Sequence, residues 1–264
     1  MEYCIDTHVH VYHCYEAEIL FSQASKNCDA PDSAEGLILC LTESSGFNFY
    51  QQLKDRVKNN ETLAGWLPTA LKDEPAILLS KGKQNIIIVA GRQVISKQGL
   101  EVLALFNDQT YDDGQNTQII IDQIVKNKGI AVLPWGVGKW LGTRGKIIEQ
   151  LLHDNQPGNL AIADISARPA LWPQPVQFDK ARKSGYNCLY GTDPLPLDYE
   201  QHRVASAGMV MELPSEASEA VARLKNLLLH QTENNFYGKR VSVLRFIKDQ
   251  LMLRLNKQAC LSAR

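Results

Sequence analysis

Short apolar runs that suit β-strands alternate along the chain with segments whose apolar residues recur at helical spacing. The strand-like runs cover residues 4–11, 36–41, 77–79, 86–95, 100–106, 130–133, 160–165, 188–190 and 209–213. Helical spacing is found over residues 118–125, 143–152 and 239–257, and after Ser215, where a helix would bury Ala220, Val221, Leu224, Leu227 and Leu228. Strands that alternate with helices form βα units around a mainly parallel sheet. We therefore expect an α/β fold, a distorted (β/α) barrel with mainly parallel strands.

Three consecutive strand-like runs make the expected barrel irregular. Residues 77–79, 86–95 and 100–106 are joined by short polar connections that leave no room for helices, so we expect a local antiparallel meander. The 264-residue chain has no tandem repeat and no low-complexity linker, and its length suits one large α/β domain. We expect a single domain over residues 1–264, with the last helix packed on it.

That last helix, expected over residues 239–257, combines basic and apolar positions. The cations are Lys239, Arg240, Arg245, Lys248, Arg254 and Lys257, and the main apolar positions are Val241, Leu244, Ile247, Leu251 and Leu255. An apolar stripe of this kind usually packs on a core, so the favoured interpretation is a helix on the barrel with a solvated basic face. Peripheral contact with an anionic membrane is the alternative, because basic amphipathic helices also bind such surfaces.

Composition narrows the choice of partner and compartment. The formal charge of −1 gives no excess of positive charge, which argues against nucleic acid as a partner. No apolar run approaches the roughly 18–20 residues of a membrane span, and the alternating first residues do not have the pattern of a signal peptide. The six cysteines are scattered without a CxxC pair, as in reduced intracellular proteins. We therefore expect a cytoplasmic protein.

The first strand-like run carries the most informative side chains, Asp6, His8 and His10. Alternate residues of a strand point to the same face, so these three side chains share one side of the expected strand. Two imidazoles at this spacing can bind one metal ion, with bonds of about 2.0–2.1 Å each. Asp6 is then a candidate to orient a ligand histidine from behind. The alternative is a strand that happens to contain two structural histidines.

A second candidate follows the strand-like run at residues 188–190. There Gly191 and Thr192 precede Asp193, which would lie at the carboxyl end of the strand. A carboxylate in that position can bind a metal ion and accept a proton from a bound water molecule. The alternative is an ordinary turn aspartate before proline.

Together, the DTHVH segment at residues 6–10 and the GTDP segment at residues 191–194 resemble the motifs of metal-dependent hydrolases of the PHP (polymerase and histidinol phosphatase) and amidohydrolase groups. Segments 41–44, 90–94, 99–105 and 132–135 stand where PHP proteins carry further motifs. The resemblance implies a TIM-barrel-like fold of the PHP kind, with a metal site at the carboxyl ends of the strands. It also implies a hydrolase that uses metal-activated water.

The sequence departs from the PHP pattern at four places. Glu43-Ser44 replaces Asp-His, Gln93 replaces a glutamate, Pro134-Trp135 replaces His-Pro, and Leu195 replaces the last histidine. Leucine has no donor atom, and a neutral amide is a weaker ligand than a carboxylate. We therefore expect a site with one metal ion, or two at most.

His8, His10 and Asp193 match the metal ligands of the resemblance directly, and Glu43 and His13 are candidate additional ligands. Three protein ligands and one water are sufficient for a catalytic zinc ion; manganese and iron are the alternatives. Asp193 would also act as the general base.

Four cations could bind an anionic substrate at the same end of the fold: Arg92, Lys139, Arg144 and Arg168. They favour a small anionic substrate, with phosphate esters first among them. Hydrolysis of an amide or a lactone is an alternative within the same class of enzyme. A PHP-like binding or scaffold protein that has lost catalysis is the alternative outside it.

Overall fold

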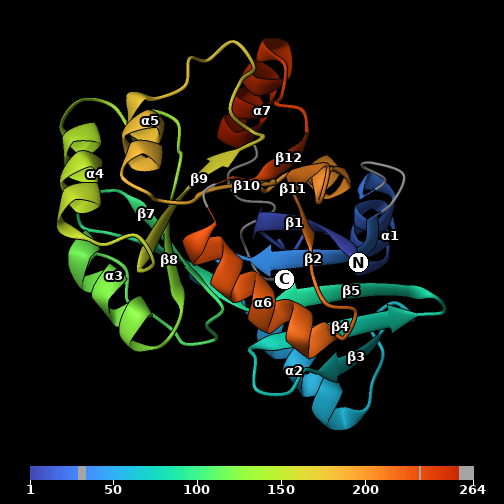
Figure 1. The fold of residues 1–264 in the computed structure, drawn as a ribbon. Coiled ribbons are helices and arrows are strands. Elements are labelled where there is room, and N and C mark those ends of the chain that lie inside the picture. Colours follow the sequence, from blue (N-terminus) through green and yellow to red (C-terminus); the bar gives the residue numbers. More distant parts are fainter. Residues whose placement is uncertain (29–33, 232, 256–264) are drawn as a thin grey trace.

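The computed structural model describes residues 1–28, 34–231 and 233–255, which form two mixed β-sheets flanked by helices (Figure 1). The seven-stranded sheet has the order β12 (Asn235–Gly238), β11 (Ala207–Glu212), β1 (Glu2–Val9), β2 (Ala34–Leu41), β5 (Gln84–Val89), β4 (Ala76–Lys81) and β3 (Leu67–Ala70). The five-stranded sheet has the order β10 (Cys188–Gly191), β9 (Leu160–Ile165), β8 (Ile130–Pro134), β7 (Glu101–Leu105) and β6 (Gly91–Ile95). The mixed α/β class predicted from the sequence is confirmed.

Two details of the predicted architecture are corrected. The pairs β1–β2, β2–β5, β8–β9 and β9–β10 are parallel, but the other six described pairs are antiparallel, so the strands are not mainly parallel. The described strands also form two separate sheets instead of one closed barrel. Short connections such as those between β3, β4 and β5 force antiparallel pairing, because a parallel crossover needs a dozen residues or more.

The run at residues 86–95, predicted as one strand, is divided between the two sheets. β5 ends at Val89, β6 begins at Gly91, and Ala90 lies between them. The expected meander is therefore two hairpins, β4–β5 and β6–β7, in different sheets. Gly91 fits this junction because a Cβ atom there would collide with the carbonyl oxygen of Leu41.

The two sheets also meet at two places through backbone hydrogen bonds. On one side, the Glu43 N–H donates to Gly91 O at 3.1 Å and the Gln93 N–H donates to Glu43 O at 2.9 Å. On the other side, the Asp193 N–H donates to His8 O at 2.9 Å. Both contacts lie just beyond the carboxyl ends of β1, β2 and β10, so side chains from distant parts of the sequence converge there.

Alternation along the strands divides the core into layers. In β7, Leu103 and Leu105 face the seven-stranded sheet, whereas Val102 and Ala104 face the helices. Helices α3 (Thr117–Lys126), α4 (Gly142–Asp154) and α5 (Val176–Lys183) cover the outer face of the five-stranded sheet. Helices α1 (Ala17–Asn27) and α2 (Phe49–Asn59) cover the other sheet.

Helix α6 (Ala217–His230) packs on the core between the sheets. Four of its five predicted core residues are buried, and Leu227 is partly buried. Its N-cap is Glu216, whose side chain accepts a hydrogen bond from the Glu219 N–H at 2.7 Å, and not Ser215.

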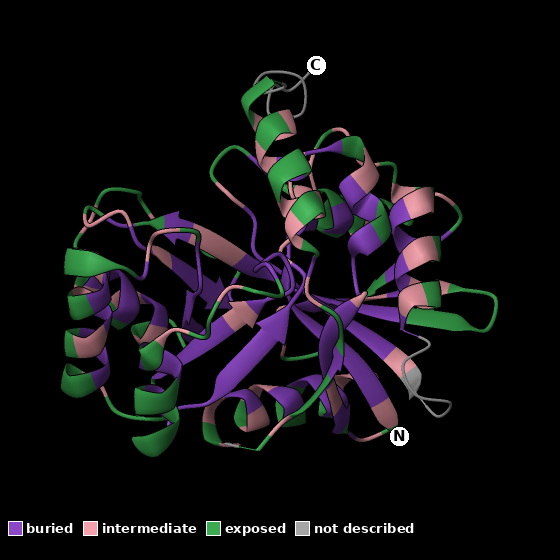
Figure 2. Ribbon diagram, turned by 90° about the horizontal axis from the view of Figure 1, so that it is seen from above, coloured by how far each residue is buried: buried purple, intermediate pink, exposed green. Residues whose placement is uncertain are grey.

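The last helix, α7 (Val243–Leu255), is oriented opposite to the prediction (Figure 2). Its buried residue is Asp249, whereas Leu244, Ile247, Leu251 and Leu255 are 82%, 50%, 53% and 78% exposed. The predicted packing of these four apolar side chains on the core is wrong. Residues 239–242 precede the helix, and residues 256 and 257 lie outside the described residues. Among the described helices, none has the length and apolar character needed to cross a bilayer.

We predict that Gly91→Ala destabilises the protein, because the added methyl group at the start of β6 would collide with the carbonyl oxygen of Leu41 at the end of β2. The expected loss of unfolding free energy is about 2–4 kcal/mol, measured by denaturant unfolding. Gly46→Ala is the matched control: its φ of 87° is unfavourable for alanine, but its surroundings are open, so a loss of about 1–2 kcal/mol is expected. Equal losses in the two variants would contradict this role of Gly91.

Candidate metal centre

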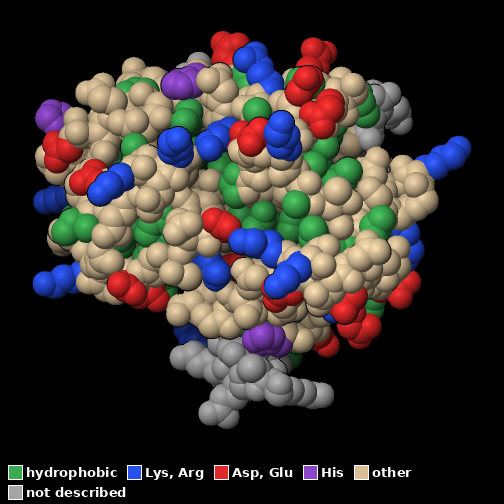
Figure 3. Space-filling view, turned by 90° about the horizontal axis from the view of Figure 1, so that it is seen from below, with side chains coloured by type: hydrophobic (Ala, Val, Ile, Leu, Met, Phe, Trp, Pro, Cys, Tyr) green, Lys and Arg blue, Asp and Glu red, His purple; other side chains and the backbone are tan. Residues whose placement is uncertain are grey.

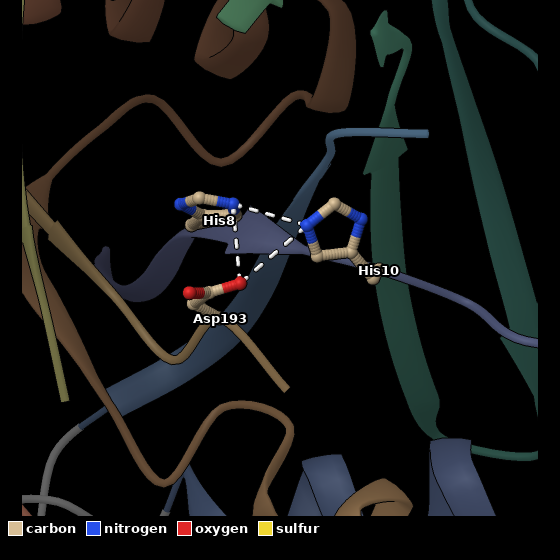
Figure 4. Close-up of side chains that lie close together, drawn as sticks. All are labelled: His8, His10 and Asp193. Atoms are coloured by element: carbon tan, nitrogen blue, oxygen red, sulfur yellow. Dashed lines mark hydrogen bonds and ion pairs between the residues drawn. The ribbon is translucent and has the colours of Figure 1, made fainter. Parts of the chain in front are cut away.

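His8, His10 and Asp193 converge just beyond the carboxyl ends of β1 and β10 (Figure 4). His8 is the penultimate residue of β1, His10 follows the strand directly, and Asp193 lies two residues after β10. The two histidines are 1% and 3% exposed, and the Asp193 side chain is 23% exposed. The period of two therefore predicted correctly that both imidazoles reach one site.

The three ligand atoms form a nearly equilateral triangle. His8 Nε2 lies 3.2 Å from His10 Nε2, and Asp193 Oδ1 lies 3.4 Å and 3.5 Å from these two nitrogens. Ligands at about 2.0–2.1 Å from one tetrahedral ion are separated by about 3.3–3.4 Å from one another. The triangle thus has the dimensions of one face of a tetrahedral zinc site, which leaves the fourth position for a small molecule.

The electrostatics of the site favour the ligand forms of the side chains. Burial lowers the pKa of His8 to about 4, so its imidazole is neutral at neutral pH and has a lone pair for a metal ion. Burial alone would raise the pKa of Asp193, but His8, a hydrogen bond from His10, and Arg203 outweigh it and lower that pKa to about 2. Asp193 is therefore a carboxylate at neutral pH.

Asp6 holds together the two segments that carry the candidate metal ligands. Its carboxylate is fully buried and accepts hydrogen bonds from Thr192 N at 2.8 Å, Thr192 Oγ1 at 2.5 Å, Ala205 N at 3.0 Å and His8 N at 3.2 Å. Burial raises the pKa of Asp6 to about 6 against the effect of these hydrogen bonds. The described contacts of Asp6 are with backbone and hydroxyl groups, so it positions the ligands through the chain and not by holding an imidazole ring.

The Gly-Thr-Asp sequence has a separate role at each position. A Cβ atom at Gly191 would lie 2.5 Å from His8 N, so glycine permits β10 to approach β1. Thr192 donates to Asp6 through both its backbone and its hydroxyl group. Asp193 has a φ of 49°, in the left-handed region that aspartate tolerates better than most residues. This backbone turn directs the carboxylate toward the histidines.

The structure does not bring Glu43 and His13 into the triangle of ligand atoms. Among the described residues, the His8, His10 and Asp193 group has no fourth member. Glu43 is buried at the contact between β2 and β6, where it accepts from Tyr50 N at 3.2 Å and faces Arg92 at 3.6 Å. Burial raises the pKa of Glu43. His13 is exposed and stacks on Phe47 with ring centroids 4.7 Å apart.

Three of the four predicted substrate-binding cations have structural partners within the protein. Arg92 donates to Phe47 O at 2.6 Å, and Arg144 donates to Gly138 O at 3.0 Å. Arg168 is fully buried and forms an ion pair with Asp164 at 2.5 Å, through two hydrogen bonds. Their predicted role in substrate binding is not supported by these contacts.

Lys139 is the predicted cation that reaches the site. Arg203, which was not predicted, reaches it as well. A cavity of about 190 Å³ is lined by both Lys139 and Asp193, and also by Arg203. Lys139 is paired with Glu101, and Arg203 with Glu200 at 2.5 Å. Arg203 lies at the end of a 3-10 turn (Asp198–Arg203), ten residues after Asp193. The charged residues of this segment, close to the GTDP segment in sequence, were the signal that could have indicated Arg203 as a site residue.

Comparisons with known proteins identify the fold. No protein-family model and no curated protein matches the chain. Among solved structures, PsfC from Pseudomonas syringae matches with a TM-score of 0.59 and 15% identity, over 97% of this chain and 98% of its own. The lesion-specific endonuclease PfuEndoQ from Pyrococcus furiosus matches with a TM-score of 0.52 and 10% identity, over 89% of this chain and 58% of its own.

Endonuclease Q is a member of the PHP family. The chain has a PHP-like fold. At 10–15% identity the likeness concerns the fold alone, and this chain spans little more than half the length of the endonuclease. The PHP-like fold confirms the resemblance found in the sequence motifs. It accounts for the convergence of residues from β1 and from the segment after β10 on one site.

We predict that His8→Ala abolishes stoichiometric metal binding. Removing one of three ligands should lower the metal content at equal free zinc by at least about tenfold, measured by elemental analysis after dialysis. His153→Ala is the matched control, because the His153 side chain is 82% exposed and distant from the triangle in sequence and contacts. Full metal content in His8→Ala would contradict the assignment of this ligand.

We also predict that Asp6→Asn weakens both the fold and the site. All four partners of Asp6 are donors, so an amide nitrogen there would face donor groups inside the protein. The expected loss of unfolding free energy is about 2–4 kcal/mol, with reduced metal content, whereas the exposed Asp55→Asn should change neither. Unchanged stability of Asp6→Asn would contradict this role.

Proposed function

We propose that the protein is a metal-dependent hydrolase and that phosphate esters are its favoured substrates. The observation that carries the proposal is the triangle of His8 Nε2, His10 Nε2 and Asp193 Oδ1, whose sides of 3.2–3.5 Å suit one divalent ion. Zinc is the first choice because the triangle fits tetrahedral geometry and two ligands are imidazoles; manganese and iron are the alternatives. The PHP-like fold is consistent with such a site.

His8 and His10 would hold the metal ion through their Nε2 atoms. The chemistry that the ion supplies when bound is a lowered pKa of coordinated water, to about 7, together with polarisation of the substrate oxygen. The ring of His10 stacks on Tyr12 at 5.5 Å between centroids, which fixes its orientation. Burial of both histidines excludes bulk water from this side of the site.

Asp193 would contribute one oxygen to the metal ion and accept a proton with its carboxylate. It is the member of the triangle that lines the cavity, where a substrate and the attacking water would lie. Lys139 and Arg203 line the same cavity and could neutralise a phosphoryl group. Their pairing with Glu101 and Glu200 partly neutralises that positive charge. The cavity is therefore also compatible with a neutral substrate, such as an amide or a lactone.

A PHP-like binding or scaffold protein without catalysis is the second candidate. The observation in its favour is the replacement of potential ligands by Gln93 and by Leu195, which lines the cavity. The metal content distinguishes the two candidates. Protein purified without chelator and supplied with zinc or manganese should bind about one ion per chain if it is the hydrolase. A chain that binds no ion under these conditions would support the scaffold instead.

We predict that Asp193→Asn lowers turnover far more than it lowers metal content. Asparagine retains one oxygen donor but accepts no proton at neutral pH, so the hydrolysis rate should fall by about 10²–10⁴-fold. The measurement is kcat with a substrate found by screening phosphate esters, amides and lactones, with metal content determined on the same samples. Near-wild-type turnover with metal bound would contradict the role of Asp193, and Glu43 or His13 would then be tested as the base.

A further inference from the structure

Helix α7 contributes to the wall of the cavity that Asp193 also lines. Phe246, Asp249 and Gln250 of this helix line that cavity, as does Val241 just before it. Glu101 of β7 and Trp135, which directly follows β8, also contribute to the wall. The helix is the last described element of the chain, and Figures 1 and 2 show it as a separate layer above the sheets.

Polar contacts hold α7 in this position. Tyr199 Oη donates to Asp249 Oδ1 at 2.8 Å, and Arg245 Nη2 donates to Glu200 Oε1 at 2.7 Å. Glu200 also pairs with Arg203, which lines the cavity. The contacts that fix the helix are therefore continuous with the charged wall of the site.

The apolar stripe predicted from the sequence does not account for this orientation. Leu244, Leu251 and Leu255 would be buried if the helix packed by its apolar stripe, but they face solvent. Burying such side chains would stabilise a protein by about 1.5–3 kcal/mol each. The helix instead buries Asp249 and presents Phe246 and Gln250 to the cavity. This orientation places Phe246, Asp249 and Gln250 at the cavity.

We propose that α7 is a roof that restricts this site to small esters, with Phe246 and Gln250 as the residues that determine the size limit. The proposal rests on the hydrolase function proposed above. The cavity of about 190 Å³ is smaller than the roughly 300–1,000 Å³ of sites for drug-sized ligands, so it suits a phosphoryl group with a short substituent.

A nucleic-acid strand requires a different surface, namely a continuous basic groove that follows its backbone. Lys139 and Arg203 are each paired with a glutamate inside the cavity. Figure 3 shows the molecule from below, away from α7 at the top of Figure 1, and on that face Lys and Arg side chains of the described residues are interspersed with Asp and Glu side chains. The paired cations of this cavity therefore favour a small phosphate ester over a nucleic-acid strand.

The test compares ligands of increasing size on the full-length, zinc-loaded protein. Calorimetry measures the binding of inorganic phosphate and thymidine 5′-monophosphate. Released phosphate measures hydrolysis of p-nitrophenyl phosphate and thymidine 5′-monophosphate, and gel electrophoresis measures cleavage of a single-stranded oligonucleotide into shorter fragments. The wild-type protein should favour the smaller member of each set. Phe246→Ala/Gln250→Ala should improve binding and hydrolysis of the mononucleotide, relative to the small ligand, by at least about tenfold.

The matched control is Leu244→Ala/Leu251→Ala on the exposed side of the same helix, which should leave both ratios unchanged. Thermal unfolding of both double variants verifies that they fold. Hydrolysis of the oligonucleotide as readily as of p-nitrophenyl phosphate would contradict the size limit set by α7 but would support the proposed hydrolase function. Size-selective binding of phosphate without any hydrolysis would support the size limit set by α7 but would contradict the proposed hydrolase function. Failure to bind inorganic phosphate, or unchanged ratios in Phe246→Ala/Gln250→Ala, would overturn the roof.

Discussion

The buried carboxylate of Asp6 connects the parts of the molecule on which the site depends. It belongs to β1 and accepts hydrogen bonds from Thr192 after β10 and from Ala205 after the 3-10 turn. These segments are 186 and 199 residues away in sequence. An unpaired carboxylate in a protein interior is costly, so it favours the arrangement in which all four donors surround it. That arrangement places Asp193 beside His8 and His10.

The hydrogen bonds to Asp6 also hold the two sheets together at one end, although the described strands form no closed barrel. β1 and β10 approach closely enough for the Asp193 N–H to donate to His8 O, and Gly191 removes the side chain that would prevent this. Their approach is fixed by a few polar contacts at the carboxyl ends of the strands, where PHP-like proteins and other α/β folds place their sites. The triangle of candidate ligand atoms is therefore a direct product of how the sheets join.

Sequence patterns predicted the features of the site that depend on local geometry. The alternation of β1 places His8 and His10 together, and the strand end at Gly191 directs Asp193 toward them. Features that depend on tertiary pairing were not predicted. Residues 86–89 of the run at 86–95 are all apolar, whereas Gly91, Arg92 and Gln93 follow Ala90, and this change in composition does not by itself reveal that the two halves enter different sheets.

Helix α7 and Arg168 illustrate the same limit. The amphipathic pattern of α7 predicted that its leucines pack inward, but Arg245 and Asp249 have partners on the 3-10 turn that only the folded chain reveals. Arg168 was expected at the substrate, and its ion pair with Asp164 four residues earlier keeps it in the protein interior. A charged residue near a strand end can therefore contribute either to the site or to the stability of the fold. Its partners in the folded chain determine which of these roles it has.

The most direct test of the central claim is an anomalous difference map at the zinc absorption edge from crystals of the zinc-loaded protein. We expect one strong peak, about 2.0–2.1 Å from His8 Nε2, His10 Nε2 and an oxygen of Asp193. A strong peak bound elsewhere, or three well-occupied peaks in the site, would contradict it.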